Sequence, residues 1–131
     1  FARMLESASE MAGDKVGKPF VCVLGEMGEL GQVACEEHRT LGRRIAAARP
    51  RMVLWKGEYE EEVRAGLEAE RFSGMFSEVS SEADMLQALE RLSPEERRNG
   101  GVVLFKGSRL NRLETFVTAF LDAQSEDSNA L

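Results

Sequence analysis

Histidine and cysteine are scarce in this chain, and their scarcity excludes several kinds of site. The 131 residues include one histidine and two cysteines. His38 has no cysteine or aspartate partner in register for a zinc site, and no plausible Ser/His/Asp order is present. Cys22 and Cys35 lack CxxC spacing, which argues against a metal or redox pair. Reduced thiols in the cytoplasm are the better expectation.

Long apolar runs and an excess of positive charge are lacking as well. No run approaches the length that crosses a bilayer, and no signal-peptide pattern opens the chain, so we expect no membrane partner. The formal net charge is −6, and a nucleic-acid partner needs a basic face, so none is expected. Lys and Arg are concentrated locally around Lys106 to Arg112. The phosphate-cradling pattern GxxxxGK[ST] is absent.

Short apolar runs alternate with stretches of helical periodicity, which is typical of βα units. Strands are predicted at 20–24, 52–55 and 102–105, of which the first and the last are expected to be buried, with a weaker strand near an edge at 71–76. Helices are predicted at 1–12, 33–48, 59–67, 81–92 and 113–121, with a short capped turn at 93–96. Strands that alternate with helices imply right-handed crossovers. The sequence therefore predicts an α/β fold, a Rossmann-like three-layer domain with a mostly parallel sheet.

The length suits one compact domain with a single core. We place it at 1–124, with an N-terminal helix at 1–12 and βα units from residue 20. The polar residues 125–131 are expected to form a frayed tail. Because the first residue is Phe1 and not methionine, the chain looks like a piece of something longer.

Two loops that each follow a predicted strand carry the charged side chains of interest. A glycine-rich loop after 20–24 carries Glu26 and Glu29, and Lys106 and Arg109 follow 102–105. In a parallel sheet both loops emerge at the same edge, where the ligand crevice lies. An arginine fork suits a carboxylate or phosphate, and lysine adds a point charge. On the residues alone, a simpler interpretation is a solvated basic turn, or a structural ion pair of Arg109 with Glu114 or Glu26.

His38 falls on the apolar stripe of the predicted helix 33–48, close to its N-terminus. That position predicts a half-buried ring that is hydrogen-bonded to the backbone.

Both loop segments resemble those of a bacterial cell-wall ligase family, which adds D-alanyl-D-alanine to UDP-N-acetylmuramoyl-tripeptide. LGEMGELGQVACEEHRTLG at 24–42 is similar to the family's LGDMLELG…ELHRELG, and VVLFKGSRLNRLE at 102–114 is similar to VVLVKGSRGMRLE. The order and spacing of the two motifs fit the family's third, C-terminal domain. The chain departs from the pattern at Leu110-Asn111, where Gly-Met is usual, at Glu26, where Asp is usual, and at Gly28, where a larger residue is usual.

The resemblance implies a parent enzyme that forms an amide bond in peptidoglycan biosynthesis at the expense of ATP. The terminal carboxylate of the tripeptide becomes an acyl phosphate, which the amine of D-alanyl-D-alanine attacks. ATP and Mg²⁺ would be bound mainly by the missing N-terminal and central domains of the same chain. This piece would supply second-substrate contacts and domain closure, and would be inactive alone.

The resemblance also assigns roles to individual residues. The loop after the last strand would bind the carboxylate of the dipeptide, through Lys106, Ser108, Arg109 and Asn111. The glycine-rich loop and the helix after it would supply residues that face the nucleotide or substrate, namely Glu26, Glu29, His38 and Arg39. No catalytic residue and no metal ligand is expected in this chain.

Two functions from other classes stay open. One is a stand-alone, non-catalytic Rossmann-like binding or interaction module. The other is a flavodoxin-like signalling domain, which needs a phospho-acceptor aspartate after a central strand. Lys56-Gly57 follows Trp55 here, so the signalling domain ranks last.

Overall fold

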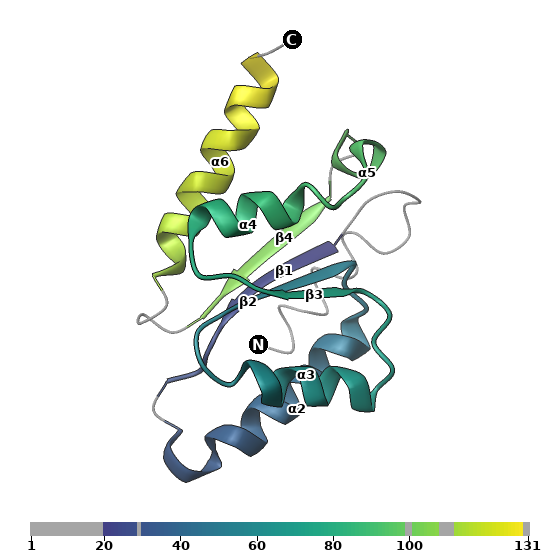
Figure 1. Cartoon of the computed structure of the whole chain (residues 1–131), viewed down its shortest axis with the longest axis vertical. Helices are drawn as coiled ribbons and strands as arrows, with labels where there is room; N and C mark the ends of the chain where they lie inside the picture. Colours follow the sequence, from purple (N-terminus) through teal and green to yellow (C-terminus); the bar gives the residue numbers. More distant parts are fainter. Residues whose placement is uncertain (1–19, 29, 99–100, 108–111, 130–131) are drawn as a thin grey trace.

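A four-stranded sheet with helices on both faces forms the body of the molecule, as a computed structural model shows (Figure 1). The structure describes residues 20–28, 30–98, 101–107 and 112–129. The helix predicted at 1–12 lies outside these residues. Within them, no helix is both long and apolar enough to span a membrane.

The elements alternate as the hydrophobic pattern predicts. The strands are β1 (Phe20–Gly25), β2 (Met52–Lys56), β3 (Met75–Glu78) and β4 (Val102–Lys106). The helices are α2 (Ala34–Ala48), α3 (Glu60–Ala69), α4 (Glu82–Leu89), α5 (Pro94–Arg98) and α6 (Leu113–Asn129), and the 3₁₀ turn η1 (Gly31–Val33) leads into α2.

The described strands are all parallel and lie in the order β3-β2-β1-β4. β1 is central and every one of its residues is buried, as a strand covered on both faces requires. The expected position of the weaker strand near an edge is confirmed, because β3 ends the described sheet.

Alternate residues of each central strand enter different cores, because successive side chains point to opposite faces. Cys22 and Leu24 pack with residues of α2 and α3, whereas Val21 and Val23 pack with residues of α4 and α6. Figure 1 shows the two helix pairs on opposite sides of the sheet. The predicted α/β, Rossmann-like three-layer fold is therefore confirmed.

α2 and α3 approach each other closely, and two glycines make this approach possible. A Cβ added at Gly42 would overlap the carbonyl oxygen of Val63, and one added at Gly66 would overlap that of Arg39. Backbone atoms cannot move aside as the end of a flexible side chain can. The pair therefore needs glycine at both positions.

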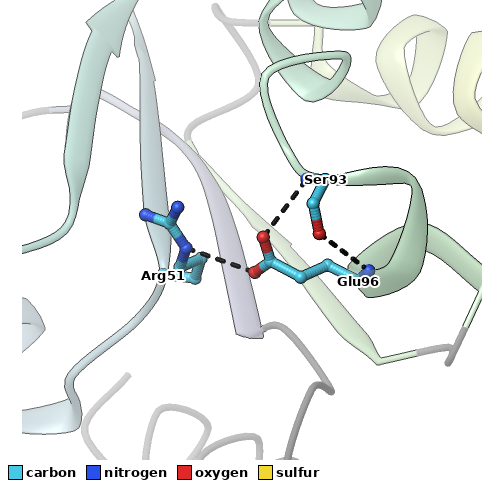
Figure 2. A network of polar contacts seen from close by, with 3 residues as sticks. All are labelled: Arg51, Ser93 and Glu96. Carbon is cyan, nitrogen blue, oxygen red and sulfur yellow. Dashed lines mark hydrogen bonds and ion pairs between the residues drawn. The ribbon is translucent and has the colours of Figure 1, made fainter.

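Two predicted N-caps are present. The Ser81 hydroxyl accepts the N–H of Asp84 at 3.1 Å. At the start of α5, the Ser93 hydroxyl accepts the N–H of Glu96 at 3.0 Å, and the Glu96 carboxylate accepts the N–H of Ser93 at 3.2 Å. This reciprocal pair is a capping box. Arg51, just before β2, donates to the same carboxylate at 3.2 Å, as Figure 2 shows.

The third strand was misplaced by the sequence pattern, which put it at 71–76. It begins only at Met75, because Arg71 and Phe72 belong to the end of α3. Arg71 has a left-handed φ of 55°, its N–H donates to the carbonyl of Glu68, and that of Phe72 donates to Leu67. These are the two bonds of a Schellman motif. A non-glycine residue at its left-handed position hid the motif from a sequence search.

α6 also runs further than the apolar stripe indicated, reaching Asn129. The sequence predicted a frayed tail from residue 125. Polar side chains do not by themselves end a helix, and no proline or glycine interrupts this stretch.

Candidate functional site

Three strands end side by side at the carboxyl edge of the sheet. Gly25 of β1 is in register with Lys56 of β2, and Leu24 is in register with Lys106 of β4. The connections from these strand ends lead into α2, α3 and α6. The glycine-rich loop and the start of the basic loop thus lie at one edge, as the parallel topology predicted.

The basic loop can be placed only at its two ends. Lys106 ends β4 and is exposed, and Gly107 follows it. Ser108, Arg109 and Asn111 lie outside the described residues, so their proposed roles stay predictions. On the far side of the loop, the carbonyl of Arg112 accepts the N–H and the hydroxyl of Thr115 in the first turn of α6. The loop is therefore anchored between β4 and the N-terminus of α6.

Glu26 connects the loop after β1 to the loop after β2. Its backbone N–H donates to the carbonyl of Lys56 at 3.3 Å, and its carboxylate accepts the N–H of Glu58 at 3.4 Å. The carboxylate therefore has a structural partner within the chain. Glu29, the other acid of this loop, lies outside the described residues.

His38 lies deeper than predicted, because its side chain is fully buried and not half-buried. The predicted hydrogen bonds to the backbone are present. Nδ1 is 2.6 Å from the carbonyl oxygen of Ala34, and Nε2 is 3.0 Å from the backbone N of Met27. Tyr59, from the loop before α3, covers the ring, which explains the deeper burial. Arg39, the next residue, is exposed.

Aromatic rings enclose the imidazole on two sides. Tyr59 stacks on it with ring centroids 4.4 Å apart and planes 13° from parallel. Trp55 meets it edge-on at 5.7 Å and 89°, and the Trp55 indole N–H donates to the carbonyl of Glu58 at 2.8 Å. Both are favourable ring arrangements.

Lys56 is a cation at this edge that sequence reasoning passed over as part of a turn. Its Nζ lies 4.7 Å from the centre of the Phe116 ring of α6, which is a cation–π contact. Lys56 ends β2 as Lys106 ends β4, and that shared position after an apolar run is the signal that would have identified it. β4 itself is half-buried and not buried as the sequence predicted.

The described residues include one deeply buried thiol and no cluster of metal-ligating side chains. Cys22 and Cys35 are both free, and burial raises the pKa of the Cys22 thiol to about 12. Among the residues described, no three His, Cys, Asp or Glu side chains lie together as a metal ion would need.

A separate open pocket of about 420 Å³ lies beside the edge strand β3. It is lined from α3, β3 and α4, and Arg91 there donates to the Ser77 hydroxyl at 2.8 Å. Of the residues predicted to bind substrate or nucleotide, none of those that the structure describes lines it.

Solved structures share this fold. Two are crystal structures of MurF from Acinetobacter baumannii, with TM-scores of 0.69 and 0.66. A third is UDP-N-acetylmuramoylalanyl-D-glutamyl-2,6-diaminopimelate--D-alanyl-D-alanyl ligase from the same organism, with a TM-score of 0.62. Each is 22% identical over 93% of this chain, which spans only 26%, 25% and 24% of those chains in turn. No curated protein matches the sequence.

The family itself is shown by a match at the sequence level. The family model described as Mur ligase, glutamate ligase domain, matches residues 1–109. This stretch contains the glycine-rich loop and the helix after it, and it reaches Arg109 in the basic loop. The chain therefore belongs to the Mur ligase family, through its glutamate ligase domain.

Proposed function

We propose that this chain is the C-terminal domain of an ATP-dependent ligase that joins D-alanyl-D-alanine to UDP-N-acetylmuramoyl-tripeptide. The observation that carries the proposal is the KGSR loop, which follows β4 at the edge of the sheet where β1 and β2 also end. The Mur ligase family match supports an amide-forming ligase. The choice of the dipeptide rests on the two sequence motifs.

In this proposal the basic loop binds the free carboxylate of the incoming dipeptide. Lys106 contributes a positive charge from the end of β4, and Arg109 contributes a planar fork that can bind both carboxylate oxygens. Ser108 and Asn111 donate the further hydrogen bonds. Holding the carboxylate fixes the amine for attack on the acyl phosphate, because orientation replaces a random encounter by a positioned one.

The parts of the parent enzyme outside this chain bind ATP, Mg²⁺ and the nucleotide-linked peptide. This assignment accords with the sequence, which has no GxxxxGK[ST] loop. The domain then acts by closing over the central domain with the dipeptide bound. The ligase works in the cytoplasm in this proposal, and the 131-residue chain alone has no ligase activity.

Arg109→Ala in the full-length enzyme tests the proposal. We expect KM for D-alanyl-D-alanine to rise roughly thirty-fold to several thousand-fold, because losing a charge-assisted bond to a desolvated carboxylate costs about 2–5 kcal/mol. KM for ATP and for the nucleotide-linked peptide should change little. Arg109→Lys should recover part of the loss, since lysine keeps the positive charge but cannot bind both carboxylate oxygens as the planar guanidinium does.

Arg44→Ala is the matched control, because Arg44 is an exposed arginine on α2. It should leave all three KM values unchanged. If the three KM values rise together in Arg109→Ala, the residue supports domain closure and the carboxylate site is wrong. A full-length enzyme without ligase activity would favour the stand-alone binding module.

A further inference from the structure

Contacts around His38 join the loop after β1 to the loop after β2. From the first loop, the N–H of Met27 donates to His38 Nε2 at 3.0 Å. From the second, the Tyr59 ring stacks on the imidazole. The Glu26 carboxylate adds a direct connection by accepting the N–H of Glu58. Residues 26–28 and 57–59 are thus held to each other and to α2.

The hydrogen bonds determine which tautomer the imidazole adopts. A backbone N–H can donate only to a bare nitrogen, so Nε2 carries no proton. The carbonyl of Ala34 needs a donor, so Nδ1 carries the proton. Both nitrogens are therefore engaged inside a fully buried site. A proton on Nε2 would break the bond to Met27.

Tyr59 supplies a second, independent observation. It has a left-handed φ of 69° and makes no side-chain hydrogen bond that caps α3. A bulky residue is strained in this conformation, and such strain persists where the surroundings over-determine it. Glycine would relieve the strain but would have no ring to lay on the imidazole. In this strained conformation, the Tyr59 ring stacks on His38.

We propose that His38, as its Nδ1–H tautomer, is a positioning residue that holds loops 26–28 and 57–59 as one unit at the carboxyl edge of the sheet. The ring itself is fully buried. It acts through Met27 and Tyr59, whose backbones are fixed before a ligand arrives. The consequence for catalysis rests on the proposed function, in which this edge faces the dipeptide.

The tautomer is tested directly by long-range ¹H–¹⁵N correlation spectroscopy of the 131-residue chain at neutral pH. We expect the pattern of an imidazole protonated at Nδ1 alone. A ring protonated at Nε2, or an equilibrium mixture of both tautomers, would overturn the proposal without any mutation.

His38→Phe tests the link to the loop, because it keeps a ring against Tyr59 and removes the acceptor for Met27. Exchange of the Met27 amide should rise about tenfold or more relative to that of Val23, a buried residue of β1 that reports global opening. His38→Gln, which offers an acceptor again, should recover part of the protection. Tyr59→Phe, which keeps the ring, should behave as the wild type.

Met27 exchange that stays in proportion to Val23 exchange in His38→Phe would overturn the link. If that variant does not fold, the tautomer of the wild-type chain still decides the proposal.

Kinetics of the full-length enzyme separate this proposal from the function on which it rests. His38→Phe should lower kcat/KM for D-alanyl-D-alanine by about tenfold, the effect of losing one buried hydrogen bond, while Arg44→Ala leaves it unchanged. An active enzyme in which His38→Phe has no effect overturns the positioning role. A wild-type enzyme without ligase activity overturns the proposed function, and the spectroscopic result then stands for the loops alone.

Discussion

Polar contacts tie the chain together at both ends of the sheet, but the His38 imidazole at the carboxyl end is buried, whereas the Arg51–Glu96 ion pair at the amino end is open to solvent. At the carboxyl end, His38 is 0% exposed. At the amino end, the side chains of Arg51 and Glu96 are 43% and 21% exposed. Water can replace the exposed contacts when they break, whereas a buried group left without its partner keeps the full cost of desolvation.

The comparison shows which end of the sheet is held in place by a buried side chain. The buried His38 ring fixes two loops at the edge of the candidate site, and it belongs to α2, which packs closely against α3. The exposed contacts start a five-residue helix and hold it near β2. We therefore expect substitutions to matter in proportion to burial rather than to the number of hydrogen bonds they remove.

The largest effect is expected at the α2–α3 contact. Gly66→Ala would place a methyl group into the carbonyl of Arg39, next to His38. Overpacking costs about 3 kcal/mol where backbone must move, and the better helix propensity of alanine returns about 1 kcal/mol. We predict a net loss of roughly 2 kcal/mol in the free energy of unfolding, measured by urea titration. Ala65→Ser, on the exposed side of the same helix, is the control and should be close to neutral.

If Gly66→Ala is as stable as the wild type or more stable, the contact between α2 and α3 can accept an added methyl group, and burial does not predict the cost of a substitution here.

A smaller effect is expected at the exposed end, from Ser93→Ala. The substitution removes the N-cap of α5 and half of the capping box. Loss of such a cap costs about 1 kcal/mol. Ser93→Thr keeps a hydroxyl at the same place and should retain most of the stability. Thermal unfolding of wild type, Ser93→Ala and Ser93→Thr measures the difference in stability. If Ser93→Ala loses as much stability as Gly66→Ala, the size of the effect does not depend on solvent exposure.

The smallest effect is expected from Glu96→Gln, and it should depend on pH. The N–H of Ser93 lowers the pKa of the Glu96 carboxyl below its usual 4.5, and the charge of Arg51 adds to this. A carboxyl whose pKa is lower in the folded state stabilises the fold above pH 4.5, and the contribution is lost as the pH falls through the folded value. We predict that the free energy of unfolding of the wild type exceeds that of Glu96→Gln by less than about 1 kcal/mol at neutral pH. The two chains should converge in acid.

High salt sharpens the same test, since it screens the contribution of Arg51 and should narrow the gap between the two chains at neutral pH. If the difference in unfolding free energy between wild type and Glu96→Gln stays the same well below pH 4.5, the charge of the carboxylate does not contribute to it.

Local sequence signals determined most of the fold. Strands at 20–24, 52–55 and 102–105 follow from short apolar runs, and the caps at Ser81 and Ser93 follow from residue type and spacing. Because these signals act over a few residues, they survive folding unchanged. Alternation of strands and helices then implies a parallel sheet, and the parallel sheet brings the glycine-rich and basic loops to one edge.

Tertiary structure decided what no local signal contains. The left-handed conformation of Arg71 moved the third strand toward Met75, although the sequence favours a strand from residue 71. His38 is fully buried because Tyr59, 21 positions further along the chain, lies over it. The Lys56 ammonium lies over the ring of Phe116 from α6, 60 positions further along the chain. For His38 and Lys56 a contact between residues distant in sequence sets the outcome, whereas the motif at Arg71 is local and is hidden only because its left-handed residue is not glycine.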